Sequence, residues 1–136
     1  MANALYDKGR QKFLEGSVHW LTDDIKAVLV DTASYTVDLA NDEFLDDIPA
    51  GEQIAHSPNF TTKTSLAGIA DAANLTFTTV SGDPCEALVI YKDTGNIATS
   101  PVLAYIDTVT SGLPVTPSGG DVTVTWDGGA NKIFKL

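Results

Sequence analysis

The most regular apolar pattern lies in the second half of the chain. Two nearly continuous apolar runs, Ala87–Tyr91 and Val102–Ile106, flank a polar segment that carries Gly95, Asn96 and Pro101. Apolar runs rich in β-branched and aromatic residues, separated by turn residues, are typical of a strand, a turn and a second strand. Because neither run alternates with polar residues, we expect both faces of this strand pair to be covered.

Similar short runs recur along the whole chain, separated by residues that favour turns. About nine strands are predicted: Val18–Leu21, Ile25–Val30, Glu52–His56, Phe60–Leu66, Leu75–Val80, Ala87–Tyr91, Val102–Ile106, Val122–Trp126 and Lys132–Leu136. Many short strands with little helix predict an all-β fold, an antiparallel β-sandwich or a jelly-roll-like arrangement. The predicted core contains Val28, Val30, Phe77, Leu88, Ile90, Leu103, Tyr105, Val124 and Trp126.

Helical spacing appears first at the N-terminus. The apolar residues there fall on one side of a helix over residues 3–15: Leu5, Tyr6, Phe13 and Leu14. Gly9 weakens this helix and Gly16 is a suitable stop. Residues 1–16 are therefore expected to form a helical segment that either caps the open end of its own core or docks as an arm on a neighbouring molecule.

A second short helix is expected at Asn41–Ile48. Asn41 or Asp42 would cap its first turn, and Pro49 would end it. The acidic residues crowded here do not have the spacing of a calcium-binding loop, and negative charge near the start of a helix is favourable without a metal.

Size and charge narrow the classes of function. The chain has 136 residues, 43% of them hydrophobic, which predicts one domain over residues 1–136. Eighteen acidic residues against eight basic ones give a net charge of −10, which disfavours nucleic-acid binding because the body would repel phosphate groups. No apolar run approaches the ~18 residues of a membrane span, and no secretory signal pattern follows the N-terminal lysines.

Candidate catalytic residues are few. Asp31-Thr32-Ala33 and Asp93-Thr94-Gly95 resemble the turns that bring two carboxylates together in aspartic proteases, but Asp and Thr also end strands by bonding nearby amides. No catalytic triad, phosphate loop or dinucleotide-binding motif is present. We therefore expect no enzyme activity and no cofactor.

Metal and thiol chemistry have equally little support. His19, His56 and the single Cys85 are too few and too widely spaced in the sequence for a zinc site, and Cys85 has no cysteine to pair with. We expect Cys85 to be a small residue at the start of a strand, and no metal ligands are assigned.

A resemblance to a known family covers nearly the whole chain. The successions Ile25–Thr32, Tyr35–Leu39 and Phe44–Gly51 resemble small virion proteins encoded among the structural genes of tailed bacteriophages. The later successions that carry the same resemblance are Ala87–Gly95, Ala104–Asp107, Gly112–Thr116, Gly120–Trp126 and Lys132–Lys135.

This resemblance implies a capsid decoration (cement) protein. Such a protein is a non-enzymatic structural protein that assembles in the host cytoplasm, binds the exterior of the virion capsid, commonly as a homotrimer, and joins neighbouring major capsid proteins. The residues that we expect at its interfaces are Leu5, Tyr6, Arg10, Phe13, His19 and Trp20. A tail, neck or fibre-associated virion protein is one alternative, and a carbohydrate- or cation-binding β-sandwich module is another.

Overall fold

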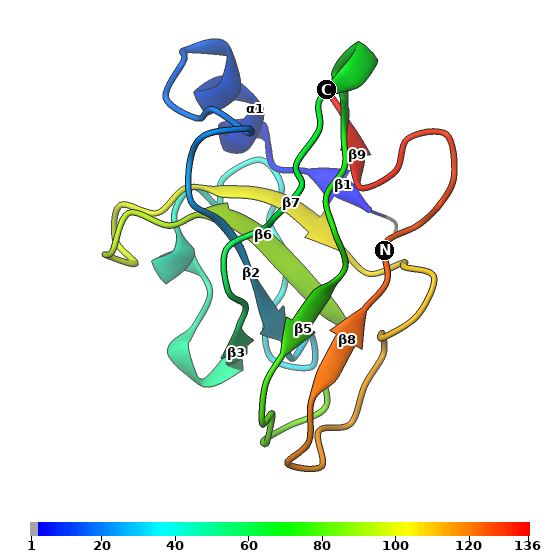
Figure 1. The fold of residues 1–136 in the computed structure, drawn as a ribbon. Coiled ribbons are helices and arrows are strands. Elements are labelled where there is room, and N and C mark those ends of the chain that lie inside the picture. The colour runs from blue at the N-terminus through cyan, green and yellow to red at the C-terminus, as the bar shows by residue number, and fades with distance from the viewer. Residues whose placement is uncertain (1–2) are drawn as a thin grey trace.

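The computed structural model describes residues 3–136 and confirms the all-β prediction. Five strands form an antiparallel main sheet in the order β1-β7-β6-β2-β3 (Figure 1). Two further pairs, β4 with β9 and β5 with β8, form separate two-stranded sheets. The bounds are β1 Ala4–Leu5, α1 Asp7–Leu14, β2 Ile25–Val30, β3 Gln53–His56, β4 Ile69–Ala70, β5 Leu75–Phe77, β6 Ala87–Lys92, β7 Val102–Ile106, β8 Val122–Val124 and β9 Phe134–Lys135.

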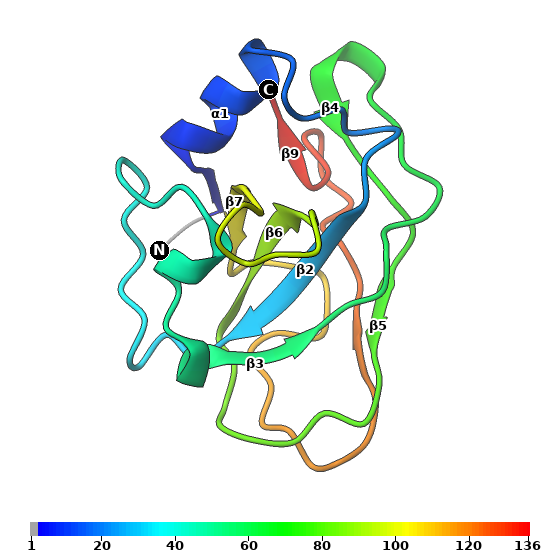
Figure 2. The ribbon, with the colours of Figure 1, turned by 90° about the vertical axis from the view of Figure 1, so that its left-hand side faces the viewer.

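The main sheet is covered on both faces. One face packs against the two small sheets and shares a core with Trp20, Phe60 and Trp126. The opposite face is covered by the segment after β2, which contributes Tyr35 and Leu45 to a second core. Figure 2 shows this segment and β5 on opposite sides of the sheet. The jelly-roll arrangement is not confirmed by this topology.

The central hairpin behaves as its pattern predicts. β6 and β7 pair from Leu88 with Ile106 to Tyr91 with Val102, and nearly all of their side chains are buried. Alternate residues therefore enter the two cores, which explains why neither run alternates in polarity. All predicted core residues are buried: Val28, Val30, Phe77, Leu88, Ile90, Leu103, Tyr105, Val124 and Trp126.

Two predicted strands are wrong. Val18–Leu21 lies in a turn, because the Asp23 carboxylate accepts a hydrogen bond from the His19 amide and redirects the chain. Phe60–Leu66 contains only an isolated bridge at Thr64. Trp20 and Phe60 are nevertheless buried. The apolar pattern of these two segments therefore reflects side chains packed in the core, and not a strand hydrogen-bonded to another strand.

The N-terminal helix is shorter than predicted. α1 covers only Asp7–Leu14, and the residues before it form β1, which pairs with β7. Leu5 lies in this strand and Tyr6 follows it with an extended backbone, and both are buried. Leu14 is exposed, so these residues do not form one helical stripe. Gly9 lies against the backbone of β7, and this contact positions α1 over the edge of the sheet.

The second predicted helix is reduced to single turns of 3-10 helix at Leu45–Asp47 and Ala50–Glu52. Neither predicted cap acts as one: Asp42 accepts hydrogen bonds from the Tyr35 hydroxyl and the Asp38 amide instead. Within the described residues, no helix is long and apolar enough to span a membrane.

Candidate docking surface

Helix α1, near the N-terminus, and strand β9, near the C-terminus, lie at one end of the fold. Figure 2 shows α1, β4 and β9 grouped there, and Figure 1 shows α1 and β9 at the same end. The ring of Phe134 lies 6.0 Å from that of Phe13 and 5.3 Å from that of Trp20. Between these elements lies a small apolar depression of about 110 Å³, which we call the terminal groove. It is lined by Phe13, Trp20, Ser65, Gly68, Ala70, Phe134 and Leu136.

Exposed leucines occur in the three segments that line the terminal groove. Leu14, next to Phe13, is 87% exposed, and Leu66, in a 3-10 turn near Gly68, is 81% exposed. Leu136 is 57% exposed and its amide donates to the Gly68 carbonyl at 2.9 Å, which holds the last residue beside that turn. Clustered exposed apolar side chains on a soluble protein mark an interaction surface more often than isolated ones do. The terminal groove and these leucines are the candidate docking surface.

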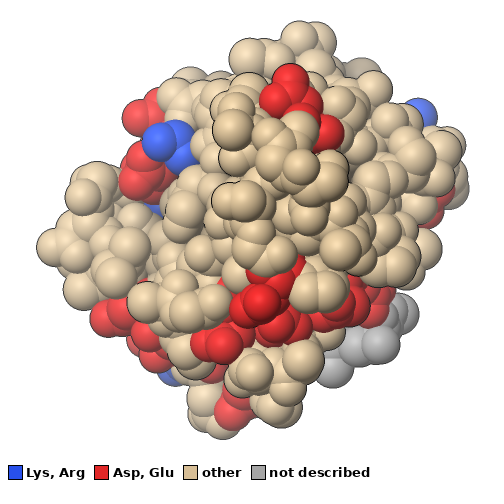
Figure 3. Space-filling view, turned by 90° about the horizontal axis from the view of Figure 1, so that it is seen from below, with Lys and Arg blue, Asp and Glu red and all other residues tan. Residues whose placement is uncertain are grey.

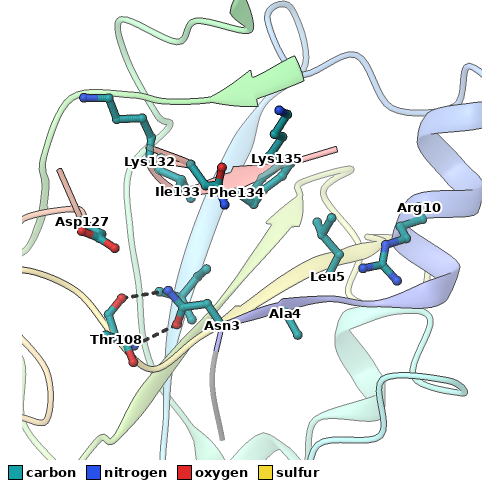
Figure 4. A pocket seen from close by; sticks show the side chains of 12 residues that line it. Asn3, Ala4, Leu5, Arg10, Thr108, Asp127, Lys132, Ile133, Phe134 and Lys135 are labelled. Atoms are coloured by element: carbon teal, nitrogen blue, oxygen red, sulfur yellow. Dashed lines mark hydrogen bonds between the residues drawn. The ribbon is translucent and has the colours of Figure 1, made fainter. Parts of the chain in front are cut away.

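A larger cavity opens on the other side of β9, and we call it the edge cavity. It has a volume of about 430 Å³ and lies between β1, the N-terminal part of α1 and the last residues of the chain (Figure 4). Asn3 closes one side, because its side chain bonds the amide and carbonyl of Thr108 at 2.9 Å each. The lining residues are Asn3, Ala4, Leu5, Arg10, Ile106, Thr108, Asp127, Asn131, Lys132, Ile133, Phe134 and Lys135.

Positive charge is distributed unevenly over the surface. Three lysines form ion pairs with carboxylates, in the pairs Lys12–Glu43, Lys26–Asp93 and Lys92–Asp23, and Lys63 donates to the backbone carbonyl of Asp23. Lys132 and Lys135 have no ion pair within residues 3–136, and Arg10 has only the exposed Asp7 at 3.2 Å. Seen from below, the molecule shows many acidic side chains and few basic ones (Figure 3). The lining of the edge cavity thus has three basic side chains, Arg10, Lys132 and Lys135, against the single carboxylate of Asp127.

The predicted interface residues fall into two groups. Leu5, Tyr6 and Trp20 are buried within the chain itself. Arg10 and His19 are exposed, and Phe13 is half-buried in the terminal groove. The structure therefore places the first group in the core, as expected if the N-terminal segment caps its own fold.

Tyr6 anchors the N-terminal segment through a buried network. Its hydroxyl lies 2.7 Å from that of Tyr35, which donates to the Asp42 carboxylate at 2.7 Å. Burial raises the pKa of both tyrosines well above the usual range, so both stay neutral and able to donate. The network ties β1 to the segment that covers the second core.

The side chains considered as catalytic or thiol candidates have surroundings that indicate a structural role. Burial raises the pKa of the Cys85 thiol to about 11, which leaves little nucleophilic thiolate at neutral pH. Asp31 and Asp93 accept bonds from amides two residues later, and Lys26 lowers the pKa of the Asp93 carboxyl through a 2.7 Å pair. Within residues 3–136, no group of three or more His, Cys, Asp or Glu side chains could hold a metal ion.

No protein-family model matches this chain, and no curated protein matches it. The interface residues expected from the sequence include Phe13, which lines the terminal groove, and Arg10, which lines the edge cavity. The sequence gives no sign of Leu66, Leu136 or the lysines of the C-terminal segment. Apolar runs alone place Leu66 at the end of one strand and Leu136 at the end of another. Only the pairing of β4 with β9, which joins segments far apart in the sequence, brings these residues together.

Proposed function

We propose that this protein is a non-enzymatic capsid decoration protein that binds the exterior of a bacteriophage shell. Its partner would be the major capsid protein, and it would act as a homotrimer. The observation that supports this role is the terminal groove with its exposed leucines, which would serve as a docking surface on a small body with two buried cores.

The physical properties of the chain suit this role. A protein that binds only the assembled shell stabilises it by mass action, and several weak contacts in one oligomer act together through a high effective concentration. A rigid body with cores on both faces of its sheet would lose little conformational entropy on docking. The net charge of −10 favours solubility and opposes association of free copies except where specific contacts form.

The carbohydrate-binding alternative has less support. Sugar-binding platforms use exposed aromatic rings, and within residues 3–136 none of the aromatic side chains is exposed. The two tryptophans, Trp20 and Trp126, are buried and donate their ring N–H groups to the backbone carbonyls of Thr64 and Ala73.

The decisive experiment adds purified protein to particles that lack it and measures bound copies. The double variant Leu14→Ser/Leu66→Ser should reduce binding by at least about tenfold, since each change removes apolar surface from the contact. Ile97→Ser is the matched control, because Ile97 is 50% exposed but lies in the loop between β6 and β7. Equal binding by the double variant and the control would show that this surface does not dock.

Copy number separates the alternatives within the virion. A decoration protein would be present in hundreds of copies at regular positions on the shell in electron cryomicroscopy. Density confined to a ring at the neck or to the tail would replace the proposal with the tail or neck alternative.

A further inference from the structure

The edge cavity lies between two strand edges that have no pairing partner in the described part of the chain. β1 is the terminal strand of the main sheet and pairs only with β7. The Tyr6 amide donates to the Leu103 carbonyl at 3.0 Å, so in this antiparallel register Tyr6 and Ala4 face β7. The N–H and C=O groups of Leu5, between them, therefore point away from β7 at the open edge.

The same alternation applies to β9. The Leu136 amide donates to the Gly68 carbonyl at 2.9 Å, and Phe134 pairs with Ala70 two residues earlier. Lys135 lies between these inward-facing positions, so its backbone groups point away from β4. Leu5 and Lys135 both line the edge cavity. Two sets of unpaired backbone groups thus border one cavity.

The side chains of the cavity divide by chemistry. Leu5, Ile106 and Ile133 are buried and supply an apolar wall. In Figure 4, Leu5 projects from β1 towards β9, and the amino groups of Lys132 and Lys135 lie at the outer rim, away from β1. An extended peptide places alternate side chains on opposite sides, so one set could meet the apolar wall and the other the cationic rim.

Figure 4 also shows that the charge varies along the length of the cavity. Arg10 reaches it from α1 at one end, and Asp127 lies at the other. Asp127 already accepts a hydrogen bond from the Gly129 amide at 3.0 Å. Arg10 is already paired with Asp7 at 3.2 Å, so the excess of positive charge comes from Lys132 and Lys135, which outnumber Asp127 and favour an anionic ligand.

We propose that the edge cavity binds an extended acidic peptide segment by strand addition between β1 and β9. Backbone hydrogen bonds to Leu5 and Lys135 supply pairing, and carboxylates of the segment meet Arg10, Lys132 and Lys135. The segment would join the main sheet to the β4–β9 sheet. That it belongs to the major capsid protein rests on the proposed function; the binding chemistry does not.

The first test is a titration of the ¹⁵N-labelled full chain, followed by NMR. The probe is the acetylated and amidated peptide Glu-Val-Glu-Val-Glu, and the control peptide has Lys in place of Glu. We expect shifts of the Leu5 and Lys135 amides, slower hydrogen exchange at both, and weakening by salt, with the acidic peptide only. No shift at these amides, or equal shifts with both peptides, would overturn the proposal.

Backbone pairing is tested by comparing Leu5→Pro with Leu5→Ala. Both remove the leucine side chain, but only proline removes the outward-facing N–H, and proline is tolerated on the open side of an edge strand. Affinity for the acidic peptide should be at least about tenfold weaker for Leu5→Pro than for Leu5→Ala. Equal affinities of two folded variants would contradict strand addition.

Charge reversal keeps the proposal testable if Leu5→Pro does not fold. Lys132→Glu/Lys135→Glu should abolish peptide binding, whereas Lys8→Glu, on α1 but outside the cavity lining, should leave it within about twofold. Binding unaffected by the double reversal would refute the cationic rim.

If shells bind the wild-type protein but no acidic peptide binds the cavity, the decoration role stands and this inference fails. Peptide binding without shell binding supports strand addition and refutes the decoration role.

Discussion

Gly9 offers the sharpest test of how α1 is attached to the sheet. A Cβ atom at this position would lie 2.8 Å from the Val102 carbonyl oxygen, 2.9 Å from the Leu103 Cα and 3.0 Å from the Leu103 carbonyl oxygen. All three neighbours are backbone atoms of β7, which is buried along its length. No side-chain rotation can relieve the contact, so Gly9→Ala must displace either α1 or β7.

The expected magnitude follows from two opposed effects. Alanine in place of glycine inside a helix gains about 1 kcal/mol through propensity. Overpacking in a filled core costs about 1–3 kcal/mol, and a clash with strand backbone belongs at the upper end of that range. Gly9→Ala should therefore lower the free energy of unfolding by about 1–2 kcal/mol. A domain of this size would lose roughly 4 °C of melting temperature per kcal/mol.

The assay is thermal and urea unfolding followed by circular dichroism, with Gly51→Ala as the control. Gly51 has no atom within 4 Å of an added Cβ and no left-handed φ, so this change should be neutral or stabilising by up to about 1 kcal/mol. If Gly9→Ala is as stable as the wild type, close packing of α1 on β7 is refuted, and with it the attachment of the N-terminal segment through this contact.

Three further predictions concern the core, the pH response and the N-terminus. Ile90→Ala or Leu103→Ala should each cost about 2–5 kcal/mol in urea unfolding, because both side chains are fully buried, and a loss below ~1 kcal/mol at both would contradict the two-faced sheet. The lowered pKa of Asp93 means that its pair with Lys26 adds stability above the unfolded-state pKa, and this stability is lost as the pH falls through the folded-state value. Asp93→Asn should therefore flatten the acid limb of a stability–pH curve, and an unchanged limb would exclude this pair. Deleting residues 1–14 should lower the thermal midpoint, since it removes β1 and α1, whereas an unchanged midpoint with lost shell binding would favour a docking arm.

The centre of the fold could be predicted because two independent signals agree there. The run from Ala87 to Tyr91 is rich in β-branched and aromatic residues, and its lack of polar residues correctly indicates burial on both faces. The alternation of Val122, Val124 and Trp126 likewise gives the correct inward face of β8.

The structure of the N-terminal segment could not be predicted, because one long helix and a strand followed by a shorter helix are both compatible with its spacing of apolar residues. Leu5 and Tyr6 enter different cores from adjacent positions of an extended strand, while Phe13 reaches the terminal groove from a helix. A single helical stripe would give a similar list of apolar residues. Only the pairing of Ala4 with Tyr105, about a hundred residues away, decides between them, and local periodicity contains no information on it.

Aromatic residues caused a similar error elsewhere. Trp20 and Phe60 pack edge to face at 5.8 Å, and Phe60 also contacts Trp126 at 5.5 Å. These rings belong to irregular segments and fill the core. Side-chain hydrogen bonds hold such segments in place, and one example is the bond that the Asp23 carboxylate accepts from the His19 amide. β propensity reflects how well a residue fits a half-buried surface, so buried loop aromatics mimic strands.

The candidate docking surface also has a thermodynamic cost that bears on its role. Unpaired strand edges and exposed leucines are both liabilities, because they invite self-association. Here the free edge of β1 borders the edge cavity and the exposed Leu136 borders the terminal groove, and Phe134 lines both. The net charge of −10 opposes the approach of identical molecules from a distance, while Lys132 and Lys135 at the cavity rim attract an acidic partner locally. Under the proposed decoration role, this combination would leave the open end available until the shell has assembled.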